Sequence, residues 1–182
     1  MSLFRRPICR STAFVVVAAG LVLTCRSASS APRAAMAPQD SVQQGIAQFK
    51  SGNFAAAEAT LRAASGTDAS AYLAASLAKQ RKYGDAEAPA RAALAANATH
   101  DVAVAALGES LVGQKKFDDA IAAMSAAIGA RGDLAYAYFW RGQGYDNKKQ
   151  TAKMAADYQE FLRLAPKAPE APTVQAILSG LR

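Results

Sequence analysis

A pattern of small and aromatic residues recurs every 34 positions, and it limits the architectures open to this chain more than any other feature. Gly108 precedes Gly142 by 34 residues, and Phe117 follows Tyr83 by the same step. Ala74 takes the glycine position one step earlier. Each period holds two stretches of apolar residues at helical spacing, so the sequence predicts a series of stacked two-helix hairpins.

The first copy departs from this period, and the last copy departs from the residue pattern within it. Phe54 precedes Tyr83 by only 29 residues, which we attribute to a shortened connection around SGTD, residues 65–68. The last copy, WRGQGYDNKKQTAKMAADYQEFLRLAP, carries Thr151 where the other copies have an aromatic residue. We therefore expect looser or shifted helix packing in the last hairpin.

The copies resemble tetratricopeptide repeats over roughly residues 38–166. The resemblance implies an all-α fold, a right-handed α-solenoid of about four helix-hairpin repeats in residues 41–166. Residues 167–182 are expected to add a capping helix, because a solenoid must cover its last apolar face. The apolar residues of that helix share one face: Val174, Ile177, Leu178 and Leu181.

Small and acidic residues have structural interpretations within each hairpin. We expect Gly108 and Ala120 to face each other and to let their two helices approach closely. Asp118 and Asp119 come at the start of a predicted helix, where the macrodipole stabilises acids, so we assign them to the helix end rather than to catalysis. Pro89 falls about one turn into its predicted helix, where few backbone hydrogen bonds are lost.

Residues 1–30 have the order of a secretory signal peptide: basic MSLFRRPICR, apolar STAFVVVAAGLVLTC and small RSASSAP. The mature chain would begin near Ala31, with residues 31–40 as a disordered lead-in. The alternatives are an uncleaved N-terminal anchor and a lipoprotein acylated at Cys25. Because the two cysteines, Cys9 and Cys25, both lie in this segment, its removal leaves no thiol for a disulfide or a metal.

The positive charge does not indicate a nucleic-acid partner. The chain has a formal net charge of +7, of which four arginines in residues 1–30 supply more than half. In the remainder, lysine and arginine are scattered among acidic residues, as on an ordinary solvated surface.

The sequence gives little support to an enzyme. The single histidine, His100, is predicted to lie in a solvent-facing turn or at a helix start. No phosphate-binding glycine loop, nucleophile elbow or spaced ligand set accompanies it. We expect no catalytic residue, no cofactor and no metal.

The resemblance implies a protein partner in a groove lined by the first helix of each repeat. We expect a partner-binding groove formed by Phe49, Lys50, Lys79, Val102, Glu109, Val112, Tyr136, Phe139 and Gln143. Further inward-facing candidates are Val42, Ile46, Ala71, Ala75, Ala78, Ala105 and Asp146.

This predicted groove is mostly apolar. Chaperone-binding members of the family clamp a carboxylate with basic residues at positions where this chain has Val42, Ile46, Val102 and Ala106, so a carboxylate clamp is rejected. An apolar groove suits an amphipathic helix or an extended apolar peptide. Phe49, Tyr136 and Phe139 are the expected aromatic anchors, with Lys50 and Lys79 favouring a partner that carries some acidic residues.

We therefore expect a non-enzymatic interaction scaffold, exported to the periplasm or to an envelope membrane of a bacterium, with membrane association only through the N-terminus. One alternative is a structural envelope component that assembles with its own copies. Another is an accessory factor for secretion, pilus or outer-membrane assembly.

Overall fold

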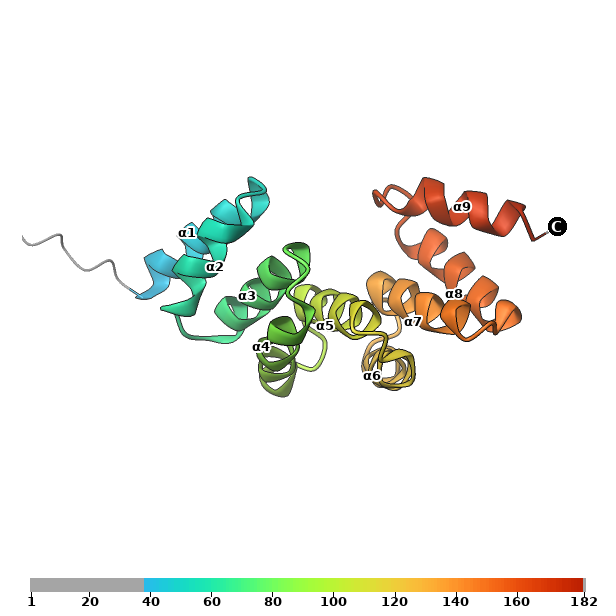
Figure 1. Cartoon of the computed structure of the whole chain (residues 1–182), viewed down its shortest axis with the longest axis horizontal. Helices are drawn as coiled ribbons and strands as arrows, with labels where there is room; N and C mark the ends of the chain where they lie inside the picture. The colour runs from blue at the N-terminus through green and yellow to red at the C-terminus, as the bar shows by residue number, and fades with distance from the viewer. Residues whose placement is uncertain (1–37, 182) are drawn as a thin grey trace, which may run out of the picture. The chain divides into compact units, whose positions relative to one another are not determined.

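The computed structural model of the chain describes residues 38–181 (Figure 1), and all regular secondary structure in that range is helical. The helices are α1 Pro38–Lys50, α2 Phe54–Arg62, α3 Thr67–Lys79, α4 Tyr83–Ala96, α5 Asp101–Gly113, α6 Phe117–Ala130, α7 Ala135–Asn147, α8 Thr151–Leu164 and α9 Ala171–Ser179. The predicted signal segment with Cys9 and Cys25 lies outside the described residues. Within them, no helix combines the length and hydropathy that a membrane span requires.

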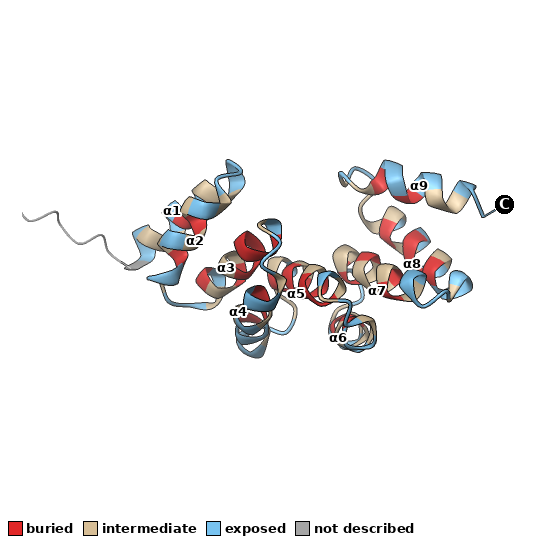
Figure 2. Cartoon of the chain, viewed as in Figure 1, coloured by how far each residue is buried: buried red, intermediate tan, exposed pale blue. Residues whose placement is uncertain are grey.

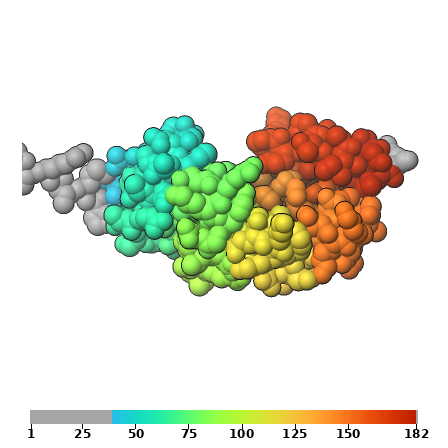
Figure 3. Space-filling view, in the orientation of Figure 1, coloured from blue at the N-terminus to red at the C-terminus, as the bar shows by residue number. Residues whose placement is uncertain are grey.

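The first eight helices form four hairpins that stack in chain order. Helix α3 packs against α1 and α2, α5 packs against α3 and α4, and α7 packs against α5 and α6. Helix α9 then packs on α8. Figure 3 shows the described segments following one another along the surface of the unit Ala35–Arg182. The described part of the chain is thus an all-α repeat solenoid that ends in an additional helix.

The four hairpin turns share one backbone conformation. In each turn one residue takes a left-handed φ: Gly52 at 82°, Arg81 at 61°, Lys115 at 63° and Lys149 at 59°. The next amide closes the turn on a carbonyl five residues back, as where Lys116 N donates to Leu111 O over 2.9 Å. Only the first turn uses glycine, so the other three hold an L-residue in a conformation that costs roughly 1–2 kcal/mol.

The irregular step between the first two hairpins comes from helix α2. This helix has 9 residues, whereas α4, α6 and α8 each have 14. The connections that follow α2, α4 and α6 all have the same length, residues 63–66, 97–100 and 131–134. The predicted shortened connection is therefore wrong. The missing residues come from the helix itself, because α2 ends at Arg62 and leaves the connection to α3 at its usual length.

Figure 2 shows the buried residues distributed along the stacked helices. The composition of this buried core changes along the chain. Alanines fill the contact of α3 with α4, whereas the last hairpin buries large side chains. Tyr158 and Phe161 are fully buried, Met154 is 2% exposed, and Val174 of α9 joins their cluster. Of the two expectations for the last hairpin, looser packing is wrong, because these aromatic rings fill the space between its helices.

Gly108 lies against the next hairpin. A Cβ atom at Gly108 would stand 2.4 Å from Cγ of Trp140 on α7. The equivalent Gly142 instead meets a side chain of its own hairpin, since a Cβ there would stand 2.7 Å from Cε1 of Tyr158. The missing side chain at Gly108 therefore makes room for an indole of the following repeat, and the pairing of Gly108 with Ala120 stays a prediction.

The expectations for helix starts are confirmed. Asp118 and Asp119 lie in the first turn of α6, and Asp85 lies in the first turn of α4. Pro89 is the seventh residue of α4, and the helix continues without a break to Ala96. Its ring removes only the backbone bond that would end on the carbonyl of Asp85.

Two junctions between hairpins carry the same polar contact. Glu58 on α2 accepts a hydrogen bond from Lys82 over 2.8 Å, and Glu87 on α4 accepts one from Lys116 over 2.9 Å. A glutamine of the following hairpin adds a bond at each carboxylate. At the third junction Ile121 stands 34 residues after Glu87, so that junction is apolar at this position.

Candidate partner-binding groove

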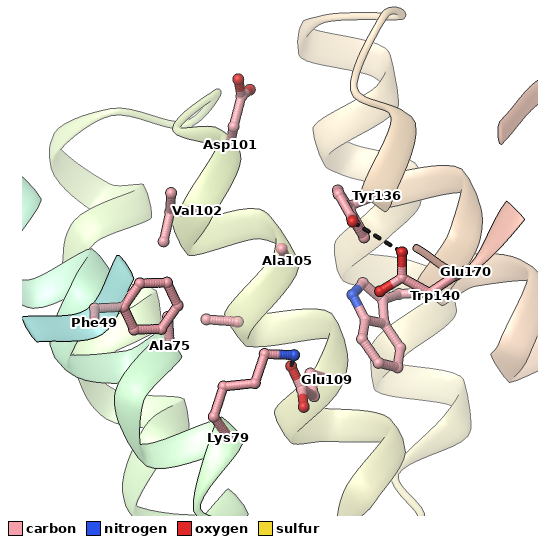
Figure 4. A pocket seen from close by; sticks show the side chains of 11 residues that line it. Phe49, Ala75, Lys79, Asp101, Val102, Ala105, Glu109, Tyr136, Trp140 and Glu170 are labelled. Carbon is pink, nitrogen blue, oxygen red and sulfur yellow. Dashed lines mark hydrogen bonds and ion pairs between the residues drawn. The ribbon is translucent and has the colours of Figure 1, made fainter. Parts of the chain in front are cut away.

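A groove of about 280 Å³ crosses the first helices of successive hairpins (Figure 4). Its floor consists of small side chains: Ala75 on α3 and Val102, Ala105 and Ala106 on α5. The α5 residues recur at helical spacing and so share one face. Because alanine projects little beyond the backbone, the floor lies close to the helix axes and leaves room above it.

Phe49 of α1 lines one end of the groove. Its ring meets Tyr72 edge to face with 5.4 Å between centroids, and it lies at the same distance from the ring of Phe54. Both contacts hold the Phe49 ring in place while part of it stays exposed to the groove.

Tyr136 and Trp140 of α7 line the opposite end. They are four residues apart and therefore neighbours on one helix face. The Trp140 ring packs edge to face on Phe139 with 4.9 Å between centroids. Its Nε1 is buried and has no hydrogen-bond partner among the described residues, and Figure 4 shows this nitrogen on the side of the ring that faces α5.

Charged side chains stand at the rim. Lys79 Nζ lies 2.9 Å from Glu109 Oε2, so an ion pair connects α3 to α5 beside the floor. Asp101 forms an ion pair with Arg131. Glu170, just before α9, accepts a hydrogen bond of 2.9 Å from the Tyr136 hydroxyl. Burial, reinforced by this bond to Glu170, raises the pKa of Tyr136 to about 12, so the phenol stays protonated.

The structure brings five of the nine predicted groove residues together. Phe49, Lys79, Val102, Glu109 and Tyr136 line the groove, and so do Ala75 and Ala105 from the wider prediction. Lys50 is exposed at the end of α1, Val112 packs against the central core, and Gln143 is half-buried outside the groove.

The prediction that Phe139 is an exposed anchor is wrong. Phe139 is 6% exposed and packs between α7 and α8, with its ring centroid 5.1 Å from that of Phe161 and 6.2 Å from that of Tyr158. Helical spacing alone allowed either Phe139 or Trp140 to follow Tyr136 along the groove, and the structure selects Trp140.

Of the two lysines expected at the rim, Lys79 lines the groove and Lys50 does not. Lys79 is paired with Glu109. Sequence reasoning missed Glu170 because this residue lies beyond the last repeat, where the 34-residue pattern gives no position. Its folding back toward Tyr136 depends on the path of the chain between α8 and α9.

His100 has a structural position at the start of α5. Its Nδ1 accepts a hydrogen bond from Ala103 N over 3.4 Å, and its Nε2 lies 2.9 Å from Asp68 Oδ1 on α3. The prediction of a helix-start residue is confirmed, and His100 connects two neighbouring hairpins. Over residues 38–181, no three His, Cys, Asp or Glu side chains are grouped to hold a metal ion.

No protein-family model and no curated protein sequence matches the chain. Solved structures do match. One is TTC0263, a thermophilic TPR protein of Thermus thermophilus, which is 19% identical over 80% of this chain and 81% of its own, with a TM-score of 0.66. The chain has the tetratricopeptide-repeat fold.

Two further tetratricopeptide-like matches come from other bacteria. PilF of Pseudomonas aeruginosa is 23% identical over 78% of this chain and 67% of its own, with a TM-score of 0.64. Residues 41 to the end of MamA from Desulfovibrio magneticus RS-1 are 21% identical over 73% of this chain and 78% of that one, with a TM-score of 0.62. The groove is thus lined by the first helix of each repeat, namely α1, α3, α5 and α7.

Proposed function

We propose that this tetratricopeptide array is a non-enzymatic interaction scaffold that holds a segment of a partner protein in its groove. The observation that carries the proposal is the continuous alanine and valine floor across α3 and α5, with aromatic rings at both ends. Apolar grooves between helices with a few polar groups at their rim are typical ligand sites. Such a groove suits an amphipathic helix or an extended segment.

The aromatic ends supply most of the expected binding energy. Phe49, Tyr136 and Trp140 can bury large areas with few rotatable bonds, whereas the alanines mainly provide a close-fitting surface. We therefore assign the anchoring role to these three side chains, and the rim ions to orientation and association rate.

Peptide selection tests this function. A random peptide library displayed on phage is selected on the full chain, and the binders are measured against two variants. Ala105→Arg places a long charged side chain on the groove floor, and Ala122→Arg makes the same change at an exposed position of α6 outside the groove. We expect binding to be lost with Ala105→Arg and kept with Ala122→Arg. Binding that is kept with Ala105→Arg and lost with Ala122→Arg would exclude the groove as the binding site.

The solution mass of the two variants tests the alternative of self-assembly. If the parent chain is an oligomer that Ala105→Arg alone converts to a monomer, the groove holds a second copy of the chain. A parent monomer supports a partner of another sequence.

We further propose that the scaffold acts in a bacterial envelope after export through residues 1–30. The support is the basic, apolar and small-residue order of that segment. N-terminal sequencing of native material should find a start near Ala31, or an acylated Cys25 if the lipoprotein alternative holds. An intact Met1 would exclude cleavage.

A further inference from the structure

We infer that the groove selects a partner segment with a lysine or arginine side chain at its Trp140 end, where Glu170 would pair with the incoming cation. This inference rests on the proposed function and adds to it the chemistry of the partner. It reverses the sign that the sequence suggested, since the two lysines expected at the rim predicted an acidic partner.

The groove has the opposite charge balance to the chain. Its charged lining residues are one lysine, Lys79, and three carboxylates, Asp101, Glu109 and Glu170. The chain as a whole carries a formal charge of +7. An excess of one sign of charge in a groove raises the local concentration of ligands of the other sign.

Two of the three carboxylates already have cationic partners. Glu109 pairs with Lys79 over 2.9 Å, and Asp101 pairs with Arg131. Glu170 differs from both, because no lysine or arginine of the described residues lies within ion-pair distance of it. Its hydrogen bond from the neutral Tyr136 hydroxyl orients the carboxylate without cancelling its charge.

The surroundings of Glu170 suit a long basic side chain. Figure 4 shows one carboxylate oxygen turned to Tyr136 and the other toward Trp140. The methylene groups of a lysine or arginine can pack on these aromatic side chains while the charged end reaches the carboxylate. An acidic segment would meet Glu170 as a like charge, which disfavours it.

Peptides selected on the full chain test the inference through their composition. We consider the peptides that bind the parent chain and lose that binding with Ala105→Arg. In their sequences we expect lysine and arginine to be enriched over the starting library and aspartate and glutamate to be depleted. Selection on Glu170→Gln should lose this enrichment. Selection on Glu160→Gln should keep it, because Glu160 is paired with Arg163 on α8 outside the groove.

One selected peptide then gives a quantitative test. Replacing its basic residue by glutamine should weaken binding to the parent chain roughly tenfold at low salt, and hardly at all to Glu170→Gln. The fluorescence of Trp140, the only tryptophan of the chain, reports binding when the peptide has none.

The outcomes separate the two proposals. If groove-dependent peptides are found without basic enrichment, or if Glu170→Gln leaves their basic residue as important as before, the inference is overturned and the scaffold stands. If every selected peptide binds Ala105→Arg as well as the parent, the groove function fails and the inference fails with it.

Discussion

Lys116 donates from Nζ to Oε2 of Glu87 over 2.9 Å, and this ion pair ties the turn between α5 and α6 to helix α4 of the preceding hairpin. Lys82 and Glu58 form the same pair one junction earlier. The lysine side chains are 44% exposed, so each pair contributes modestly to stability, and its position fixes which turn meets which helix.

These pairs predict a loss of stability in acid. The hydrogen bond from Lys116 is the main reason that the pKa of Glu87 is lowered from 4.5 to about 2. Because the folded-state pKa is depressed, the stabilisation is present above the unfolded value and is lost as pH falls from about 4.5 to 2. Urea titration of the parent and of Glu87→Gln gives the free energy of unfolding of each. The two free energies should differ at neutral pH and converge as the pH falls to about 2.

A matched carboxylate provides the control for that series. Asp146 is exposed and forms no ion pair within residues 38–181, so Asp146→Asn should change stability little at either pH. A Glu87→Gln difference that stays constant throughout the acid range would show that the Lys116 pair does not stabilise the fold.

A glycine pair tests the contact between hairpins. Gly108→Ala should lower the free energy of unfolding by about 1–3 kcal/mol, because the new Cβ would stand 2.4 Å from Trp140. Gly129→Ala, on the open side of α6 with no neighbouring atom, should raise it by up to about 1 kcal/mol. Denaturant titration followed by Trp140 fluorescence measures both free energies of unfolding. An equal gain in stability from Gly108→Ala and Gly129→Ala would refute the close contact of Gly108 with Trp140.

Phe139→Ala should act on stability before it acts on binding. Removing a ring that is 6% exposed should cost about 3–5 kcal/mol, measured by thermal unfolding followed by circular dichroism. Leu181→Ala is the comparison, since this side chain is 47% exposed and should change the midpoint little. An unchanged midpoint in Phe139→Ala would mean that the ring is free for a partner after all.

The buried ion pair of the last hairpin can be exchanged for the apolar pair of the hairpin before it. Arg141 donates two bonds, of 2.8 and 2.7 Å, to Asp157, and the residues 34 positions earlier are Leu107 and Ala123. Asp157→Ala alone leaves a guanidinium without its partner and should cost about 3–5 kcal/mol. Adding Arg141→Leu should restore most of that loss, because both desolvated charges are then gone.

Chemical denaturation of the parent, Asp157→Ala, Arg141→Leu and the double variant measures the coupling free energy between Arg141 and Asp157. A double variant as unstable as Asp157→Ala would show that the loss comes from packing rather than from the unpaired charge.

The repeat pattern predicted those features of the fold that are determined by residues close together in the sequence. Phe117, Asp118 and Asp119 mark the start of a helix through side chains that act within one turn, and the structure starts α6 there. The phase of a helix about its own axis has no such local cause. Phe139 and Trp140 are adjacent in sequence, and the one that meets the groove is decided by Gly108, which accepts the indole from the neighbouring hairpin.

Glu170 and α2 show two further limits of a periodic pattern. Glu170 reaches Tyr136 across 34 residues of chain, through a loop that belongs to no repeat. Helix α2 has 9 residues where α4 has 14, and the 29-residue step shows that residues are missing without showing whether the helix or the connection lost them. Each is a tertiary or backbone effect that residue spacing does not encode.

The change from an alanine core to an aromatic core has a consequence for motion. Where each hairpin contacts only its neighbours, the free energy of local opening follows the apolar area buried there. The first hairpin has the short α2 and buries Ala57 and Leu61, whereas the last buries Tyr158 and Phe161. Amide hydrogens of α1 and α2 should therefore exchange fastest, and each opening would withdraw Phe49 while Trp140 stays in place. The groove would thus have one yielding wall and one fixed wall, so that segments of different bulk could enter against the same anchor.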